Sequence, residues 1–289
     1  MGFFYKLFGK KEQTEDTGGK VNLSPEQFLA TSYIKDIVNR YKKEAVLLLP
    51  HAAGKPVSSL RSKFGGIPNY NSFDRHPCCD SCQTPLNFVL QLYKSDFPGH
   101  YFPSKKNLFQ LFRCPNNNCP EAYAEPFLAD HKMFVYYFEN NEAANKHFEV
   151  PLPGTGEFEP PVPDCILKPE LIDDYPVYDD FDNVTDDIER IYGEELAESF
   201  MEEFSAMQRT KIGGYPSFTQ PSFYPVCACG NEKEFFFQLS SEDTEAGVVN
   251  PVPDNWSPHH IMIGDLGNIY FYVCKSCGES SIESYWDCY

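Results

Sequence analysis

Eleven cysteines are the residues of this chain whose spacing points most directly to chemistry, and eight of them form four close pairs. In each half of the 289-residue sequence, one pair precedes a segment with strand character and another pair follows a later one. A tight turn that carries two cysteines offers two thiolates, and two such turns side by side supply the four ligands that structural zinc prefers. The sequence therefore predicts two zinc ions, one held by Cys79, Cys82, Cys114 and Cys119 and the other by Cys227, Cys229, Cys274 and Cys277.

Disulfide bonds are the competing interpretation of these pairs. An odd number of cysteines, short paired spacings and the lack of a signal-peptide pattern favour a reducing compartment and metal binding. A loop as short as Cys227-x-Cys229 would also strain a disulfide. Because four thiolates leave no open position on the metal, we expect structural rather than catalytic zinc.

Several other residues lie close to these pairs and could compete with them. Cys78 could replace Cys79 as a ligand, although the alignment of the two halves selects Cys79. We expect Cys78, Cys165 and Cys288 to be free thiols. Four histidines could stand in as ligands, namely His76, His131, His259 and His260.

The two halves of the chain carry the same landmarks in the same order. The segments 62–68 and 210–216 share a K-x-G-G-x-P pattern at an offset of 148 residues, and Cys79 and Cys227 keep that offset. Gln91 and Gln238, each in the middle of a strand-like segment, are 147 residues apart. The second half carries about a dozen extra residues within 240–267, and the repeat predicts two duplicated β-rich halves in a pseudo-twofold relation.

Hydrophobic patterns predict a mainly β (α+β) protein with two helical segments. The first helix starts at a capping box formed by Ser24 and Gln27 and ends near Lys43. The second helix is acidic and runs from about 186 to 208, with Gly193 bending it. Residues 150–178 are rich in proline and are expected to form a linker or extended arm. Strands are expected at 45–49, 86–93, 107–114, 133–138, 234–239, 268–274 and 281–286.

These elements suggest four regions along the chain. Residues 1–23 would form a flexible N-terminus, and 24–150 the first β-rich half. Residues 151–209 would form the proline-rich acidic linker with its helix, and 210–289 the second half.

Two features of the repeat are best explained by structure rather than by ligand binding. The paired glycines of the K-x-G-G-x-P segments permit positive φ or a close backbone approach, and the proline closes the turn. Gln91 and Gln238 are expected to bond to backbone groups and to pin the strand register or the joint between the halves. A ligand contact is the alternative for both glutamines.

The formal net charge of −18 is concentrated in one segment. Residues 170–203 hold 14 acidic residues and one basic residue, Arg190, which gives −13. This composition excludes a general phosphate-neutralising surface for nucleic acid and disfavours anionic membranes. It is typical either of a solvated acidic helix or of a surface that attracts a basic partner.

The cysteine pairs stand in a pattern that resembles a known family. A C-x-x-C-x-x-P-L-x-F-x-L-Q-L-Y pattern at 79–93 is similar to the amino-terminal half of the programmed cell death 2 family. The C-x-C-G pattern at 227–230 and G-x-I-Y-x-Y-x-C-x-x-C at 267–277 are similar to its carboxy-terminal domain. A-V-L-L-L-P at 45–50 and K-F-G-G-I-P at 63–68 also resemble bacterial YwqG-like proteins, which have no settled role.

The resemblance implies a cytoplasmic chaperone that captures a small-subunit ribosomal protein and helps ribosome assembly. This chain departs from some eukaryotic members because it lacks an inserted zinc finger. We therefore expect a non-enzymatic, monomeric, zinc-stabilised module that binds a basic protein and no nucleic acid or membrane directly. An immunity-type protein that neutralises a basic toxin is the alternative, and an enzyme site would have to come from His259, His260, Asp265 and Trp256.

Overall fold

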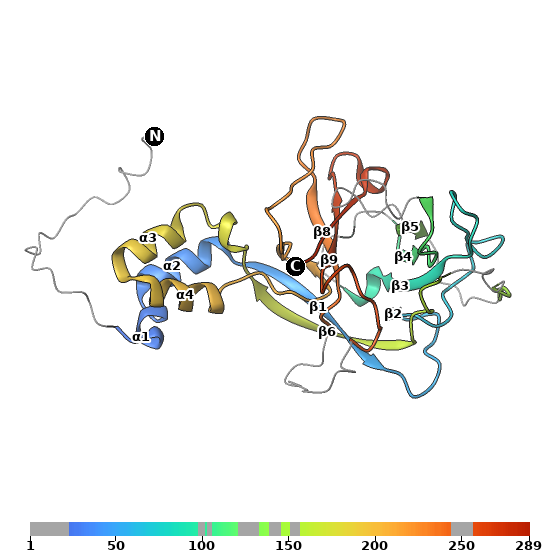
Figure 1. Ribbon diagram of the computed structural model, residues 1–289, viewed down its shortest axis with the longest axis horizontal. Helices are drawn as coiled ribbons and strands as arrows, with labels where there is room; N and C mark the ends of the chain where they lie inside the picture. The colour runs from blue at the N-terminus through green and yellow to red at the C-terminus, as the bar shows by residue number, and fades with distance from the viewer. Residues whose placement is uncertain are drawn as a thin grey trace, which may run out of the picture.

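Ten strands form a single antiparallel sheet in the computed structural model, which describes residues 23–97, 102, 106–120, 133–138, 146–150, 157–243 and 257–289. The order across the sheet is β10-β9-β8-β7-β1-β6-β2-β3-β4-β5, so that β1 and β6 lie at its centre (Figure 1). The strands are β1 Lys43–Ala52, β2 Lys63–Phe64, β3 Asn87–Tyr93, β4 Leu108–Arg113, β5 Met133–Phe138, β6 Cys165–Asp174, β7 Lys211–Gly213, β8 Glu234–Ser240, β9 Asn268–Val273 and β10 Glu283–Asp287. The expectation of a mainly β protein is confirmed, and six of the seven predicted strands match within about two residues.

The central ribbon of β1 and β6 corrects the prediction of a linker at 150–178. All ten residues of each strand pair, from Lys43 opposite Asp174 to Ala52 opposite Cys165. The prolines Pro50 and Pro169 do not interrupt this ladder, because neither N–H position faces the partner strand. Ala53 N–H donates to Asp164 O at 3.1 Å, and the antiparallel alternation places both prolines in the non-hydrogen-bonded pairs. Proline is tolerated at such outward positions, so β1 also continues past Pro50, where the sequence predicted its end.

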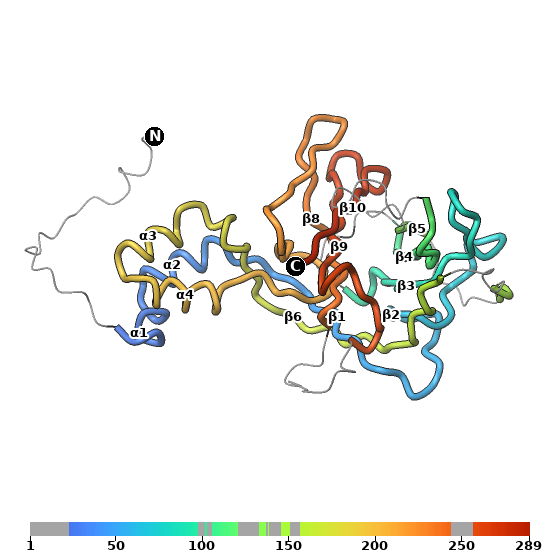
Figure 2. Tube along the Cα trace, in the orientation of Figure 1, coloured from blue at the N-terminus to red at the C-terminus, as the bar shows by residue number. Residues whose placement is uncertain are grey.

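Two arms extend from the β1–β6 centre of the sheet: the first arm is β2, β3, β4 and β5, and the second arm is β7, β8, β9 and β10. The arms curl until their inner faces meet around one core, which gives a barrel-like shape (Figure 2). The ring of Phe109 on β4 lies 5.6 Å from that of Phe236 and 5.9 Å from that of Phe237, both on β8. Because β4 and β8 lie far apart in the strand order, these contacts close the two arms over each other. The core includes buried side chains from both arms and from the central ribbon, such as Val46, Leu48, Phe64, Leu90, Phe271 and Val273.

Four helices form a separate lobe at the far end of the central ribbon, which we call the helical lobe (Figure 1). They are α1 Pro25–Leu29, α2 Ser32–Tyr41, α3 Val184–Tyr192 and α4 Glu194–Glu203. The described residues also contain three short 3-10 helices: η4 Tyr178–Asp180, which lies beside this lobe, and η2 Lys94–Asp96 and η5 Gly278–Ser281, which belong to the sheet region. The lobe has its own apolar core, made of Phe28, Ile34, Ile37, Tyr175, Phe181, Ile188, Leu196, Ala197 and Phe200.

Each helical segment predicted as one helix is in fact two. The predicted capping box is present, since the Ser24 hydroxyl accepts from Gln27 N–H and the Gln27 side chain accepts from Ser24 N–H. A second cap follows at Thr31, whose hydroxyl accepts from Ile34 N–H and starts α2. Gly193 has φ of 99° and separates α3 from α4, so it breaks the acidic helix rather than bending it.

Polar contacts join the helical lobe to the second arm of the sheet. The Tyr215 hydroxyl donates to Tyr41 O at 2.6 Å, and the Lys43 amine lies 3.9 Å from the centre of the Tyr215 ring. The Tyr224 hydroxyl also donates to Asp180 beside α3. The acidic segment is therefore docked through defined side chains at the end that meets the sheet.

Candidate metal centres

The structure brings together the first predicted set of four cysteines. The sulfur atoms of Cys79, Cys82, Cys114 and Cys119 all lie within 4.8 Å of one another. The Cys79 and Cys119 sulfurs are 3.8 Å apart, and those of Cys82 and Cys114 are 3.6 Å apart. The first pair precedes β3 and the second follows β4, so the β3–β4 hairpin positions both turns at one end.

The second predicted set forms an equivalent cluster in the other arm. The sulfurs of Cys227, Cys229, Cys274 and Cys277 also lie within 4.8 Å of one another. The Cys227–Cys277 and Cys229–Cys274 sulfur distances are 3.8 Å and 3.6 Å. Here the β8–β9 hairpin brings the two turns together.

Three of the four cysteine turns share one backbone geometry. The residue directly after the second cysteine has positive φ, and its N–H donates to the carbonyl of the first cysteine. These residues are Gln83, Gly230 and Gly278, with donor–acceptor distances of 2.9, 2.8 and 2.8 Å. Such a closed turn directs both sulfurs to the same side, which a chelating pair of ligands requires. Glycine suits this conformation, and Gln83 adopts it at some cost in backbone energy.

The sulfur separations match tetrahedral coordination and not disulfide bonding. None of the eleven cysteines is paired in a disulfide bond. A zinc ion with four Zn–S bonds of about 2.3 Å would hold its sulfurs about 3.8 Å apart. The paired separations of 3.6 and 3.8 Å therefore suit a metal of this size in both clusters. Each cluster can hold a metal ion with all four protein ligands in place, which leaves no coordination position for a substrate.

Hydrogen bonds within the turns prepare some thiols for ionisation. Burial disfavours the Cys82 thiolate, but the Thr84 hydroxyl and N–H outweigh this and lower the pKa of Cys82 to about 6. Backbone hydrogen bonds from Cys277 and Ser276 lower the pKa of Cys274 to about 7. The neighbouring thiol shifts the other way in each cluster: burial raises the pKa of Cys114, and hydrogen bonds with Cys229 and Cys227 raise the pKa of Cys277 to about 12. One thiol of each cluster therefore ionises most readily, and the thiolate is the form that ligates metal.

The two clusters differ in their exposure to solvent. In the first cluster Cys79, Cys114 and Cys119 are buried and Cys82 is half-buried. In the second cluster Cys229 and Cys277 are both exposed. A metal in the second cluster would therefore be open to chelators and thiol reagents from one side, whereas the first cluster is enclosed.

The remaining cysteines lie outside both clusters. Cys78, the alternative to Cys79, is half-buried and its sulfur lies 3.7 Å from His76 O. Cys165 is buried on β6, and Cys288 lies beyond β10. The choice of Cys79 over Cys78 agrees with the geometry of the cluster.

None of the described histidines takes part in either cluster. His76 is buried, and its two ring nitrogens lie 2.8 Å from the Tyr70 hydroxyl and from Leu86 O. Burial lowers the pKa of His76, which keeps the ring neutral. His259 is buried against Asp243 at 3.1 Å, and His260 is exposed. His131 and Trp256 lie outside the described residues.

Of the residues considered for an enzyme site, His259 and His260 line one cavity of about 400 Å³ together with Arg113 and Glu159, and Asp265 is not among its lining residues. The Asp243 carboxylate accepts from His259 and from the hydroxyl and N–H of Thr210. His259, Asp243 and Thr210 are all fully buried, and His259 packs on Phe64 of the opposite arm at 4.7 Å. This network fastens the loop after β8 to the first arm, and Asp265 lies in the exposed turn before β9.

The two repeat glutamines act as the sequence predicted. Gln91 and Gln238 are fully buried. The Gln91 amide donates to Ser59 O and Arg61 O, and its carbonyl accepts from Asn69 N–H at 2.9 Å. The Gln238 amide donates to Arg209 O and its carbonyl accepts from Ser217 N–H at 3.0 Å. Each glutamine ties its strand to the loops on both sides of the K-x-G-G-x-P segment.

The glycines of that segment sit where a side chain has no room. Gly65 has φ of 54°, and an added Cβ would lie 2.2 Å from Pro163 O. Gly214 has φ of 71°, and its Cβ would lie 2.1 Å from a carboxylate oxygen of Asp174. The prediction of positive φ and close backbone approach is confirmed.

Sequence reasoning missed the role of the lysine in the same segment. Lys211 is fully buried and donates to the buried Asp174 carboxylate at 2.8 Å. Burial lowers the pKa of Lys211, and the Asp174 charge opposes this effect. Lys63 occupies the corresponding place in the first arm and pairs with Asp164 at 3.1 Å. The repetition of the lysine in both segments was the available signal.

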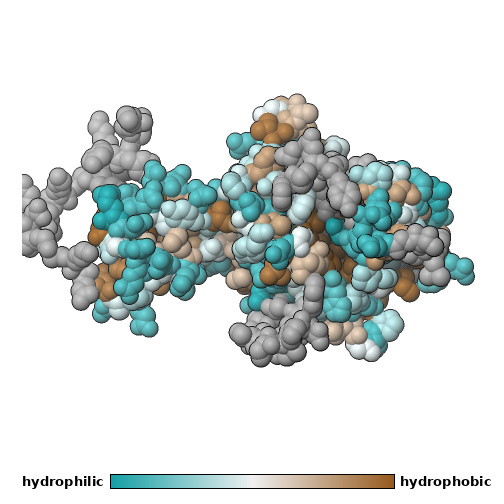
Figure 3. Space-filling model, in the orientation of Figure 1, coloured by the Kyte–Doolittle hydropathy of each residue, from teal (hydrophilic) through white to brown (hydrophobic). Residues whose placement is uncertain are grey.

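The acidic segment presents most of its charge to solvent, and hydrophilic residues cover much of the visible face of the helical lobe (Figure 3). Asp174 is buried with Lys211, and Asp187 bonds to Arg190 at the surface. Eleven of the fourteen acids are exposed: Glu170, Asp173, Asp179, Asp182, Asp186, Glu189, Glu194, Glu195, Glu198, Glu202 and Glu203.

Both cysteine clusters lie within a region that matches a known family. A family model described as Domain of unknown function (DUF1963) matches residues 62–277, which span both cysteine clusters. This match agrees with the resemblance to YwqG-like proteins, whereas the resemblance to the programmed cell death 2 family stays a prediction. No curated protein matches the chain. Among the described residues, no helix combines the length and apolar character needed to cross a membrane.

Proposed function

Since the chain belongs to the family described as Domain of unknown function (DUF1963), we propose that it is a non-catalytic module that captures a basic protein. The observation that carries this proposal is the exposed acidity of residues 170–203, which present eleven solvent-exposed carboxylates, seven of them on α3 and α4 of the helical lobe. Such a surface attracts cationic partners and raises their rate of association. The programmed cell death 2 resemblance suggests a cytoplasmic chaperone whose client is a basic small-subunit ribosomal protein.

The charge of the lobe is largely uncompensated within the described residues. Few basic side chains pair with it: Arg190 with Asp187, Lys42 with Asp173, and Lys211 with the buried Asp174. No ion pair joins the glutamates of α4 to a basic side chain within the described residues. Exposed carboxylates repel one another, and a basic partner would relieve this repulsion.

Zinc is the metal that we propose for both clusters, as structural ions. Four cysteine ligands at tetrahedral separations form the donor set that structural zinc uses in proteins. Bound zinc would hold the two turns of each cluster together, since metal binding and folding are coupled in small sites of this kind. The zinc would thereby brace the end of each sheet arm.

We also propose that the two arms arose by duplication. The motif lysines hold equivalent places: Lys63 of β2 pairs with Gln91 of β3, and Lys211 of β7 pairs with Gln238 of β8. The ladders β3–β4 and β8–β9 both shift register at the third residue, between Phe88 and Leu90 and between Phe235 and Phe237. The strand order also reads alike outward from the β1–β6 centre.

The first strand of each repeat would be exchanged between the arms. β1 pairs with β7, opposing Leu47 to Lys211, and β6 pairs with β2, opposing Ile166 to Lys63. This register aligns Leu-Leu-Leu-Pro at 47–50 with Ile-Leu-Lys-Pro at 166–169. The second repeat would then begin near Cys165, and the acidic helices would be an insertion between its first two strands.

Affinity capture from lysate at low and high salt tests the proposed function. The test variant carries amides at four exposed α4 acids, namely Glu194→Gln, Glu195→Gln, Glu198→Gln and Glu202→Gln. The matched control loses the same charge outside the helical lobe, through Glu149→Gln, Glu157→Gln, Glu232→Gln and Asp265→Asn, all at exposed positions.

We expect the wild-type chain and the control to capture a basic protein at low salt and the α4 variant to lose it. Capture that is insensitive to the α4 changes, or recovery of no basic protein, would refute the proposal. Mass spectrometry then distinguishes a ribosomal client from a basic toxin such as a nuclease.

A further inference from the structure

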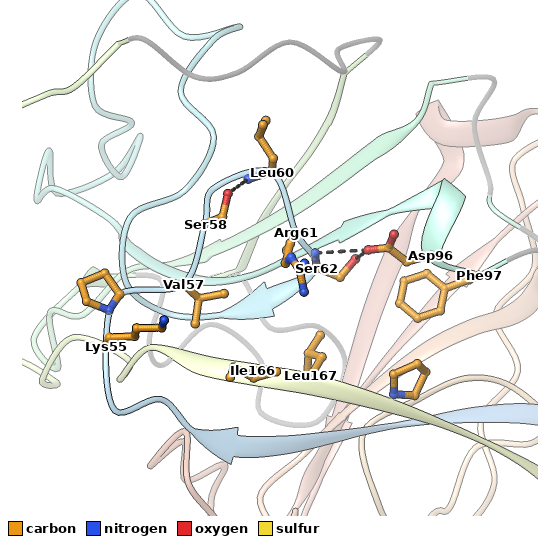
Figure 4. Close-up of a pocket in the computed structure, with 12 residues that line it drawn as sticks. Lys55, Val57, Ser58, Leu60, Arg61, Ser62, Asp96, Phe97, Ile166 and Leu167 are labelled. Carbon is orange, nitrogen blue, oxygen red and sulfur yellow. Dashed lines mark hydrogen bonds between the residues drawn. The ribbon is translucent and has the colours of Figure 1, made fainter.

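We propose that the open edge of β6 is a docking site for an extended peptide that carries a carboxylate, separate from the acidic face of the helical lobe. The site is a cavity of about 670 Å³ between β6 and the loop that precedes β2. Figure 4 shows Lys55 and Arg61 on the loop side of the cavity, facing Ile166 and Leu167 on β6. Three features carry the proposal: free backbone groups, an apolar floor and two cations.

One side of β6 is open beyond its first two residues in the part of the chain that the structure describes. β2 pairs only with Cys165 and Ile166, and within the described residues no other strand adjoins β6 on that side. The hydrogen bond from Ala53 to Asp164 sets the alternation of the β1–β6 ladder. The N–H and C=O groups of Leu167 and Leu171 therefore point away from β1, toward the open side.

The corresponding place in the other arm is partly filled. There the chain before β7 stays beside β1 for one residue more, and Leu48 N–H donates to Thr210 O at 2.9 Å. The equivalent residue of β6 is Leu167, and the chain before β2 turns away at Ser62 without making this bond. The cavity is the space that this divergence leaves in the sheet. A further strand beside β6 is its natural occupant.

Apolar side chains at this edge are exposed to an unusual degree. Leu171 is 62% exposed and Ile166 is 45% exposed, although both belong to a central strand of the sheet. Leu167 and Phe97 line the cavity floor. An added strand would pair its backbone with β6, which is the mode known as strand addition. Its side chains would flank Ile166 on one face of the sheet and Leu171 on the other, because these two residues point to opposite faces. Pro169 presents only a carbonyl to this side, so the incoming strand would meet one interruption.

The charge of the cavity wall is opposite to that of the protein as a whole. Lys55 and Arg61 are exposed, and neither charged group has an ion-pair partner among the described residues. Asp96 is the single carboxylate among the lining residues, and it accepts from Ser62 N–H and from the Ser62 hydroxyl at 2.6 Å. In a chain of net charge −18, two such cations beside an open strand select a peptide with a glutamate, an aspartate or a C-terminal carboxylate.

Selection from a displayed library of random dodecapeptides, followed by binding of the labelled selected peptide, tests the proposal. We expect peptides that alternate apolar residues around an acidic one. The variant Lys55→Glu with Arg61→Glu should weaken binding at least tenfold, and Leu171→Pro should do the same by removing an edge N–H. Lys35→Glu on α2, an exposed cation far from the cavity, is the matched control and should bind as the wild type does.

The bound peptide should slow amide hydrogen exchange at Leu167 and Leu171. Octanoate serves as a competitor that has a carboxylate and an apolar hydrocarbon chain but no peptide backbone. A failure to select any peptide would overturn the proposal. Peptide binding that survives both the Lys55→Glu, Arg61→Glu variant and Leu171→Pro would also overturn it. A third refuting result is that octanoate binds while the bound peptide leaves amide hydrogen exchange in β6 unchanged.

Discussion

Removal of metal should proceed in two distinct steps, because the two cysteine clusters differ in exposure. The second cluster presents Cys229 and Cys277 to solvent, whereas three of the four sulfurs of the first cluster are buried. A chelator or a mercurial thiol reagent needs direct access to the metal or to a ligand sulfur. We expect the second ion to leave first and the first ion to follow only as its arm opens.

The expected amounts follow from the geometry and from the energy of zinc binding. Purified protein should contain two zinc ions per chain, since both clusters place their paired sulfurs at 3.6 and 3.8 Å. Structural zinc contributes an apparent ~10–16 kcal/mol in small peptides at neutral pH. A whole domain is stable by only about 5–15 kcal/mol. Loss of one ion should therefore abolish cooperative unfolding of the arm that held it.

The assay follows zinc release with a coloured zinc indicator while a mercurial is added, with circular dichroism recorded in parallel. The wild type should release one ion quickly and one slowly. Cys229→Ser should lose the fast step and keep the slow one, and Cys119→Ser should do the reverse. Cys288→Ser removes a thiol outside both clusters and should change neither step.

Three results would refute the reasoning about the clusters. The first is a metal content well below two ions in protein prepared without chelator. The second is a metal-free chain that still unfolds cooperatively at the same temperature. The third is a fast step that disappears in Cys119→Ser and persists in Cys229→Ser, since this would reverse the order that exposure predicts.

Three further predictions concern stability. Asp174→Ala leaves a buried lysine amine without its partner and should cost about 3–5 kcal/mol, whereas Asp173→Ala removes an exposed ion pair and should cost at most about 1 kcal/mol in urea unfolding. Gly214→Ala places a Cβ at positive φ and against the Asp174 carboxylate, and should lower the free energy of unfolding by about 2–4 kcal/mol. Gly54→Ala places its Cβ in open space and should change the urea midpoint of unfolding little. The folded pKa of His76 is lowered by burial, so the unfolded chain binds the proton more tightly, and stability falls as the pH drops below about 6.5. His76→Asn should remove a slope of up to about 1.4 kcal/mol per pH unit.

Each variant is compared with a matched variant or with the pH dependence of the wild type, and the comparison can contradict the prediction. Equal losses in Asp174→Ala and Asp173→Ala would mean that the buried pair adds nothing beyond a surface pair. A Gly214→Ala variant as stable as Gly54→Ala would contradict the close approach to Asp174. Acid also protonates thiolates in the wild type and in His76→Asn alike, so identical pH slopes for the two proteins would exclude the histidine as a cause.

The cysteine clusters were the most predictable part of the structure, because each depends on short spacings. A C-x-x-C or C-x-C turn places two sulfurs together through local hydrogen bonds, such as that from Gly230 N–H to Cys227 O. The hairpins β3–β4 and β8–β9 are also local enough for alternating patterns to reveal them. The capping box at Ser24 belongs to the same class of short-range signal.

The central ribbon could not be predicted in the same way, because its partners are about 120 residues apart. Residues 165–174 lie in the proline-rich stretch 150–178 that predicted an arm, and nothing nearby along the chain indicates that β1 is their partner. A proline excludes a strand only when its missing N–H faces the neighbouring strand. At Pro169 that position faces away, which depends on a register decided by distant residues.

The sequence by itself determined the local pieces of this protein: the cysteine turns, the hairpins, the first helix cap and the glycine turns. Each of these depends on hydrogen bonds and steric limits within a few residues. The tertiary structure alone decided that β1 and β6 pair, that Lys211 is buried with Asp174, and that β6 keeps an open edge. These features depend on which backbone and charged groups are satisfied once distant segments meet, and no short stretch of sequence contains that information.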